Sequence, residues 1–436
     1  MFFNTEIMTE FILLIATIFT FLLISIVPFN YILRMNESVS YLDTKTFNLV
    51  FFINFILFLN LMNFELIVIK NIFYLIFLLT IFFNFYLYYN EKKIKISNND
   101  YLYIVLLFVC FVISVSIAYA PTLGWTAQND WIGKTILLLQ NKKMISLQSS
   151  PASEFPILLP ALWSFFWNLF NSNYEYLGRL FFVFLYLFSI LSFLEIFNIK
   201  LLKRIIAFLV LVLVSLKIEH FQGDPAILGF SLVLLSMKYL YEITLNNNVS
   251  RFNVILLFLI TNLIVWSLNE GIFYAFFIIS SLAFFSKAPK IKNFGILVLI
   301  FYVILILFRI FIYKFYNIEF RLNSNNYALN NFGENLNLNN IYLISKYLLF
   351  NTLRTDLLVF AIPLICYYFA FSKDNKGIRL TVYIILINIL FIYFYFLFND
   401  ETIEGMLKQK MIPLLFMSSP FYLLPVAIFV KSKFKL

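Results

Sequence analysis

Three carboxylates stand out because each lies in a short polar stretch of a very apolar sequence: Asp130, Glu154 and Asp224. Asp130 falls in Trp-Thr-Ala-Gln-Asn-Asp-Trp, Glu154 in Ser-Glu-Phe-Pro, and Asp224 in Gln-Gly-Asp-Pro. An ionisable side chain held at membrane depth points to a functional site. A carboxylate in such a place can act as a general base that takes the proton of an acceptor hydroxyl. We therefore take these three residues as the candidate catalytic groups.

Asp130 has two interpretations that the residues alone do not separate. A helix over 124–140 would place Thr126, Asp130 and Lys134 on one face, at i, i+4 spacing. The structural interpretation is an Asp130–Lys134 surface pair, which stabilises by a few tenths of a kcal/mol. The functional interpretation makes Asp130 the base, with Thr126, Trp131 and Lys134 as substrate-binding residues.

Glu154 and Asp224 each have a structural explanation as well. Glu154 precedes the apolar segment 156–170, where a helix N-terminus favours negative charge. Asp224 is followed by Pro225, which is typical of a helix start with Asp as the N-cap. His220 is the single histidine and is a candidate substrate-binding residue. These residues indicate no required cofactor. A divalent cation could bind between converging carboxylates, although no ligand spacing supports one.

Further charges lie at the ends of apolar segments. Glu270 occurs in Asn-Glu-Gly, Arg179 begins one apolar segment, and Arg309 ends another. Each side chain either extends to the membrane surface so that its charge meets water, or lines a pocket for a lipid phosphate. We expect a substrate phosphate near Lys134, Arg179 or Lys410, and Glu270 in the same substrate-binding set.

The composition determines the class of protein that must position these groups. Of 436 residues, 62% are hydrophobic and 12% are charged, where a soluble domain has about 25%. The fold class predicted is therefore an all-α polytopic membrane protein, a single integral membrane domain over residues 1–436. We do not infer nucleic-acid binding from the net charge of +10, because in a membrane protein the position of charge matters more than its sum.

Thirteen apolar stretches are interpreted as transmembrane helices. A span needs about 20 residues, with a range of about 17 to 25, and several of these stretches are short, so their boundaries are soft. They are 7–27, 47–69, 71–90, 101–119, 176–197, 205–219, 225–243, 252–268, 271–286, 294–313, 356–371, 379–398 and 411–430.

Basic residues predict the orientation of these spans. Lys and Arg collect in cytoplasmic loops, and five basic clusters fall on one side if thirteen spans alternate. The outer loops would then be 120–175, 220–224, 314–355 and 399–410. The basic clusters stay on one side only if the segment 156–170 does not cross the membrane. We therefore predict an interfacial helix there, with its tryptophans as anchors. The segment 341–351 receives the same interpretation.

Several motifs resemble bacterial polytopic glycosyltransferases of the GT-C fold, the group that includes protein O-mannosyltransferases (glycosyltransferase family 39) and lipid A sugar transferases. The resemblance lies in Gly-Trp-Thr-Ala from Gly124, Ser-Glu-Phe-Pro from Ser153, Gly-Asp-Pro from Gly223 and Asn-Glu-Gly from Asn269. It covers about residues 100–290. The relatives carry Asp directly after Gly-Trp, where this chain has Thr126, so Asp130 would have to replace that residue.

The resemblance implies an inverting glycosyltransferase of the inner (cytoplasmic) membrane with its active site on the outer face. The implied donor is a polyprenyl-phosphate-linked sugar, and the acceptor is a lipid, glycan or protein. Two alternatives stay open, namely a flippase or transporter of a lipid-linked glycan and an O-antigen-polymerase-like protein. A transporter would carry charges near the bilayer midplane in broken helices. Glu65, Glu195 and Lys238 instead lie toward the ends of predicted spans.

Overall fold

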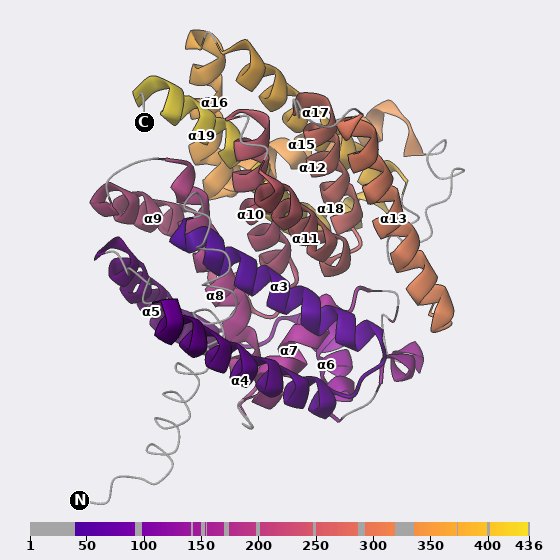
Figure 1. The fold of residues 1–436 in the computed structure, drawn as a ribbon. Helices are drawn as coiled ribbons and strands as arrows, with labels where there is room; N and C mark the ends of the chain where they lie inside the picture. The colour runs from indigo at the N-terminus through magenta and orange to yellow at the C-terminus, as the bar shows by residue number, and fades with distance from the viewer. Residues whose placement is uncertain are drawn as a thin grey trace, which may run out of the picture. The chain divides into compact units, whose positions relative to one another are not determined.

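The computed structural model is helical throughout the part of the chain that it describes, and no strand occurs there (Figure 1). The described residues are 40–91, 98–140, 143–149, 153, 155–169, 174–197, 201–246, 250–286, 293–318, 335–372, 374–398 and 402–434. The helices form two compact units. The first unit contains helices α3 to α7, most of α8 and the segment Phe221–Gly223, and the second contains the remainder of the described helices.

The first unit is built around the short helix α7. Its helices are α3 (Tyr41–Leu61), α4 (Leu66–Glu91), α5 (Asn98–Tyr119), α6 (Ile132–Leu139), α7 (Leu158–Leu169) and α8 (Tyr176–Phe193), with a π-helix η1 (Ala127–Trp131) and a 3-10 turn η2 (Met144–Ser149). Helices α3, α4 and α6 all contact α7. Phe165 of α7 packs edge-on against Phe52 and Phe73 of α3 and α4. These aromatic contacts make α7 the core of the unit.

The second unit is built around α10. Its helices are α9 (Leu201–Ser215), α10 (Ala226–Thr244), α11 (Arg251–Ser267), α12 (Gly271–Phe285), α13 (Phe294–Phe315), α15 (Leu338–Arg354), α16 (Asp356–Phe371), α17 (Asn375–Leu397), α18 (Ile403–Ser418) and α19 (Pro420–Phe434), with 3-10 turns η3 (Leu194–Ile196) and η4 (Ile218–Phe221). Helix α10 is buried along almost its whole length and contacts α11, α12, α18 and α19. A helix apolar on all sides has to be enclosed by others, as α10 is.

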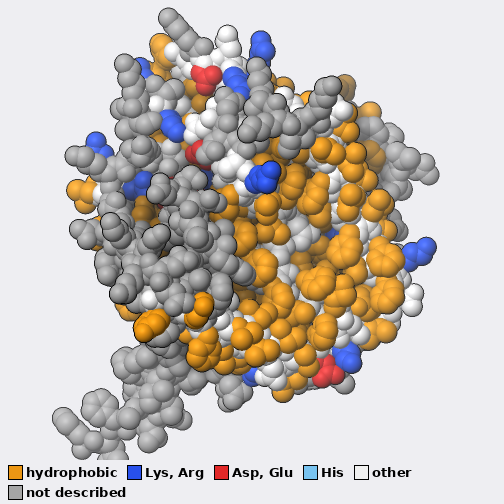
Figure 2. Space-filling model, viewed as in Figure 1, with side chains coloured by type: hydrophobic (Ala, Val, Ile, Leu, Met, Phe, Trp, Pro, Cys, Tyr) orange, Lys and Arg blue, Asp and Glu red, His pale blue; other side chains and the backbone are white. Residues whose placement is uncertain are grey.

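Helix α13 shows the opposite pattern. It is the most apolar of the candidate spans, yet only 17% of its window is buried. The exposed side chains recur along one side of the helix: Ile296, Ile300, Val303, Leu307, Phe311 and Phe315. Figure 2 shows how widely hydrophobic side chains cover the viewed face of the protein. Such a surface is unstable in water and matches the interior of a lipid bilayer. The chain is therefore a multi-pass integral membrane protein.

The number of spans differs from the prediction. Seven of the described helices are long and apolar enough to cross a membrane, or eight if one bent pair is a single span, so the count of thirteen is wrong by this criterion. The first predicted span, 7–27, lies outside the described residues. Several other predicted spans are helices of fewer than 18 residues, the length required by this criterion, such as α11 with 17 residues and α12 with 15. The predicted orientation assumed thirteen crossings, so it stays a prediction.

The predicted interfacial helix 156–170 is helical as α7, but only Trp167 of its two tryptophans is partly exposed, and Trp163 does not lie at the surface. Trp163 is completely buried and packs edge-on against Phe182 of α8. Trp131 is also buried, whereas Trp125 is 77% exposed. The prediction failed for Trp163 because Gly178 of α8 leaves room for the indole ring: a Cβ at Gly178 would lie 2.2 Å from Trp163 Cδ1.

The second predicted interfacial segment, 341–351, lies in α15. This helix ends at Arg354, and α16 leaves at an angle of 98°. Its exposed residues include Leu338, Tyr342, Leu349 and Leu353. The sharp bend at Thr355 is that of a broken span or a re-entrant loop.

Candidate functional site

Arg179 connects two loops that lie far apart in the sequence. Its side chain is 4% exposed and forms a two-pronged ion pair with Glu175, with Nε to Oε1 at 2.7 Å and Nη2 to Oε2 at 2.9 Å. The same guanidinium donates to the carbonyl of Pro121 at 3.2 Å and to that of Phe221 at 2.9 Å. A planar guanidinium can make all these bonds at once, which an ammonium cannot. In this conformation Arg179 holds two backbone segments, and we describe it as a clamp.

The clamped loops also contact each other directly. The backbone N–H of Gly124 donates to the carbonyl of Gln222 at 2.9 Å. Gly223 has φ of +90°, and a Cβ there would lie 2.9 Å from the Cβ of Ala127. Two of the motifs singled out in the sequence, the one at Gly124 and the one at Gly223, therefore pack together within the first unit. Only a glycine satisfies both the backbone angle and the space at position 223.

The segment that carries Asp130 is not the regular α-helix predicted over 124–140. Residues Ala127–Trp131 form a π-helix, and the N–H of Ile132 donates to the carbonyl of Ala127. Lys134 is buried whereas Thr126 and Asp130 are partly exposed, so these three side chains do not form the exposed Asp130–Lys134 surface pair that the structural interpretation predicts. Single π-turns of this kind occur often at functional sites.

The side chains around this turn differ in exposure. Asp130 and Thr126 are partly exposed, while Lys134 is 1% exposed. The Lys134 ammonium lies 5.7 Å from the centroid of the Trp131 ring, a cation–π contact. Lys134 is thus held inside the unit, and Asp130 is the more accessible of the two charged groups.

Asp224 and His220 belong to the second unit. Asp224 Oδ1 accepts the N–H of Ala226, the first residue of α10, at 2.7 Å, which is the capping role that the sequence suggests. His220 stacks on Phe416 with ring centroids 3.7 Å apart. Burial, and then the nearby charge of Lys217, lower the pKa of His220 to about 4, so the ring is neutral at pH 7.

A buried polar cluster lies where α11 ends and α12 begins. Arg309 of α13 is completely buried and donates to the carbonyl of Val265 at 2.6 Å, to that of Leu268 at 3.2 Å and to Oδ1 of Asn269. The guanidinium also lies over the rings of Trp266 and Tyr313. Arg309 therefore fixes the backbone that leads into the Asn-Glu-Gly turn and the side chain of its first residue, Asn269.

Glu270 follows directly and accepts a hydrogen bond from a residue that lines an aromatic groove. The hydroxyl of Tyr395 in α17 donates to Glu270 Oε1 at 3.0 Å. Tyr395 also lines a cavity of about 520 Å³ between α12 and α17. The other lining side chains are all apolar: Phe273, Phe276, Phe277, Ile387, Leu390, Phe391, Phe394 and Phe398. This volume is typical of small-molecule sites, and the groove has a polar group at the position of Tyr395.

The sequence contains a signal for this groove in the spacing of its aromatic residues. Phe273, Phe276 and Phe277 are spaced i, i+3 and i+4, as are Phe391, Phe394 and Tyr395. That spacing places each set on one helix face. What the spacing does not tell is that the two faces meet around open space instead of filling it.

The remaining predicted residues lie apart from these features or outside the described residues. Glu154 is not among the described residues. Lys410 is half-buried in α18. Among the residues that the structure describes, no group of three His, Cys, Asp or Glu side chains is arranged to hold a metal ion.

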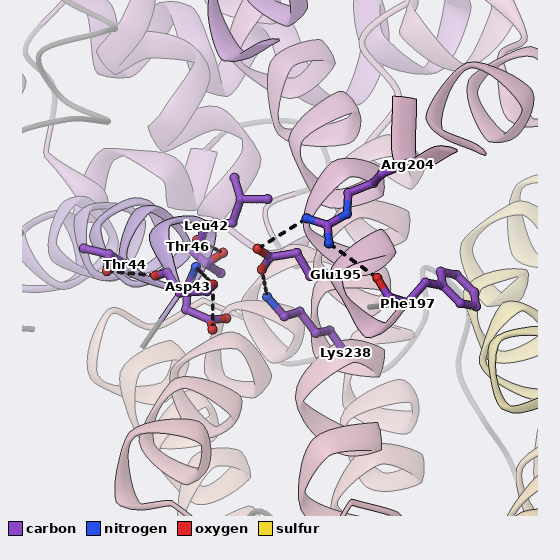
Figure 3. Close-up of polar contacts among 9 residues, drawn as sticks. Leu42, Asp43, Thr44, Thr46, Glu195, Phe197, Arg204 and Lys238 are labelled. Carbon is purple, nitrogen blue, oxygen red and sulfur yellow. Dashed lines mark hydrogen bonds and ion pairs between the residues drawn. The ribbon is translucent and has the colours of Figure 1, made fainter. Parts of the chain in front are cut away.

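A second charged cluster lies in the second unit around Glu195. Its carboxylate pairs with Lys238 at 2.5 Å and with Arg204 at 3.9 Å (Figure 3). Arg204 also donates to the carbonyl of Phe197 at 3.4 Å. Lys238 is 4% exposed although it belongs to a candidate span. A charge buried at this depth requires such partners.

Comparison with known proteins gives no assignment: no family model, no curated protein and no solved structure matches the chain.

Proposed function

We propose that the chain is a membrane glycosyltransferase that moves a sugar from a polyprenyl-phosphate donor to a lipid, glycan or protein acceptor. The observation that carries the proposal is the aromatic groove between α12 and α17, whose lining includes Tyr395, the hydrogen-bond donor to Glu270. A groove lined only by apolar and aromatic groups in a membrane protein suits a hydrocarbon chain. The adjoining carboxylate suits the hydroxyl groups of a sugar.

The reaction needs a base and little else from the protein. An acceptor hydroxyl attacks the anomeric carbon, the bond from that carbon to the phosphate oxygen breaks, and a carboxylate takes the hydroxyl proton. Because phosphate is already a good leaving group, the enzyme mainly positions the two substrates. From the sequence motifs alone, and not from any contact with the groove, we propose Asp130, the partly exposed carboxylate of the π-turn, as the base and supporting roles for Glu154 and Asp224.

Crosslinking tests the lipid-binding part of this proposal. An isoprenoid phosphate with a photoreactive group near the end of its chain should label α12 and α17 in the purified protein. Phe277→Ala together with Phe391→Ala should change the labelled positions, whereas Phe311→Ala on the exposed side of α13 should not. Labelling spread evenly over the apolar surface would contradict a lipid site in the groove.

Activity tests the catalytic part separately. Asp130→Asn should abolish sugar transfer in membranes while the protein still inserts and keeps its thermal stability, since an amide cannot take up the hydroxyl proton. Wild-type transfer by this variant would move the base to another carboxylate, with Glu154 the first to test.

A transporter of a lipid-linked glycan is the second candidate, and one observation favours it. Helices α15 and α16 meet at a 98° bend, as in a broken span or a re-entrant loop, and discontinuous helices are typical of transporter sites. If reconstituted protein moves a fluorescent isoprenoid-linked sugar across vesicles without transferring the sugar, this second function replaces the first.

A further inference from the structure

The second unit contains another cavity, of about 220 Å³, with a different lining. Tyr241 and Asn246 contribute from the end of α10, Asp374 and Lys376 from the start of α17, and Lys431 from α19. The aromatic groove is lined almost entirely by carbon. This cavity instead combines two ammonium groups, a carboxylate, a phenol and an amide with the apolar side chains of Leu245 and Ile428. Such a lining suits a charged ligand that also has an apolar part.

The position of this cavity along the helices indicates its depth in the membrane. Three candidate spans end or begin there: Ala226–Thr244 ends, Asn375–Leu397 begins and Ile403–Lys431 ends. A bilayer's hydrocarbon core is about as thick as these spans are long. The cavity therefore lies at the level of the lipid headgroups.

Both lysine side chains are held at the cavity wall. Lys376 Nζ donates to the carbonyl of Thr244, and the Lys431 ammonium lies 4.9 Å from the centroid of the Tyr241 ring. The Asp374 carboxylate is used for capping: Oδ1 accepts the N–H of Gly377 at 3.0 Å and Oδ2 the hydroxyl of Tyr368 at 3.4 Å. Two positioned cations thus face one carboxylate that already accepts two hydrogen bonds.

Exposed aromatic groups continue from this cavity along α16. Tyr367 is 41% exposed and Phe371 67% exposed. Tyr367 contacts Phe429 of α19, with ring centroids 5.3 Å apart, and the Lys433 ammonium lies 5.7 Å from the Tyr367 ring. An apolar surface that adjoins a basic cavity matches a molecule with a charged head and a hydrocarbon tail.

We propose that this cavity binds the phosphate ester of an anionic membrane phospholipid, with Lys376 and Lys431 as its ligands and α16 beside the acyl chains. Basic cavities between helix ends bind lipid headgroups in this way. This site is separate from the proposed transferase site and does not depend on it.

The test measures thermal unfolding of the purified full-length protein in a non-ionic detergent. Phosphatidylglycerol, phosphatidylcholine and inorganic phosphate are each titrated, because a ligand that binds only the folded state raises the unfolding temperature. We expect saturable stabilisation by phosphatidylglycerol alone. Equal stabilisation by phosphatidylcholine would contradict charge recognition, and equal stabilisation by inorganic phosphate would contradict a lipid site.

Variants connect the effect to the cavity. The double variant Lys376→Gln, Lys431→Gln should weaken phosphatidylglycerol binding at least about tenfold. The charge-matched control is the double variant Lys346→Gln, Lys408→Gln, which removes two exposed lysines and should leave binding unchanged. Unchanged binding by the first pair overturns the proposal.

Asp374→Asn gives a second test that does not depend on the folding of the double variant. Asn still accepts the helix-start N–H and so keeps the cap of α17, but it removes the negative charge from the cavity. We expect the affinity for phosphatidylglycerol to rise about threefold. A fall in affinity would show that the carboxylate attracts a cationic group of the ligand, which contradicts an anionic lipid.

Discussion

Arg179 and Glu175 lie one helical turn apart at the start of α8 and form two parallel hydrogen bonds, of 2.7 and 2.9 Å. Burial raises the pKa of the Glu175 carboxyl, and the Arg179 charge and hydrogen bond act in the opposite direction. The pair lets one guanidinium also hold the backbone at Pro121 and Phe221. A local contact of α8 thus fixes the two loops that carry the sequence motifs.

Replacing Arg179 should therefore destabilise the first unit more than an exposed charge would. Arg179→Met removes the ion pair and the carbonyl contacts and leaves Glu175 largely buried without its partner, at a cost of about 3 kcal/mol. Lys408→Met breaks the exposed pair with Glu404 and should leave the unfolding temperature nearly unchanged, because solvent screens such a pair. Thermal unfolding in detergent measures both. Similar losses for the two variants would contradict the clamp.

His220 should make stability depend on pH. The folded pKa is about 4 and the ordinary value is 6.5, so between these pH values the unfolded chain binds a proton and the folded chain does not. The free energy of unfolding should then fall as the pH decreases from 6.5 to 4, by about 3 kcal/mol in total.

His220→Phe is the matched variant for this measurement. It keeps an aromatic ring for the stack on Phe416 and removes the titrating group. Unfolding followed at several pH values should show a weaker acid sensitivity in the variant. Identical pH profiles would show that other groups cause the effect.

Gly271 should not accept even one extra carbon. A Cβ at this position would lie 2.0 Å from the backbone carbonyl oxygen of Ile264, which cannot turn aside as a side chain can. Gly271→Ala should therefore push α12 away from α11 and cost about 1–3 kcal/mol. Because the shift includes Glu270, binding in the aromatic groove should weaken as well.

Gly133 is the control for this substitution. No atom lies within 4 Å of a Cβ built there, and the residue is inside helix α6. Gly133→Ala should stabilise the protein by up to about 1 kcal/mol through helix propensity. The two alanine variants should thus shift the unfolding temperature in opposite directions.

Asp224 can be tested for a role beyond capping. Asn accepts the same helix-start hydrogen bond, so Asp224→Asn should keep expression and thermal stability near those of the wild type. If the charge serves catalysis, the variant should lose at least about tenfold in transfer rate, or ~1.4 kcal/mol. Full activity together with a destabilised Asp224→Ala would make Asp224 a cap alone.

Local features of the sequence determined the protein class and the positions of most helices. Its apolar composition leaves no surface for water, so a helical membrane protein follows from the residues alone. The Asp224–Pro225 pair predicts the start of α10 because capping depends on neighbouring residues. The number of crossings was overestimated. An apolar run predicts a helix, but whether that helix is long enough to cross the membrane depends on the tertiary packing that sets where it begins and ends.

Tertiary structure alone decided what the individual polar and aromatic groups do. Arg179 is a candidate phosphate ligand by sequence, but in the structure its guanidinium contacts Glu175 and carbonyls 58 and 42 residues away. Trp163 is an expected surface anchor, but it packs into the space above Gly178. The aromatic groove needs two helix faces that are more than 100 residues apart. Such relationships arise from long-range packing, and the local periodicity of a chain carries no information about which faces will meet.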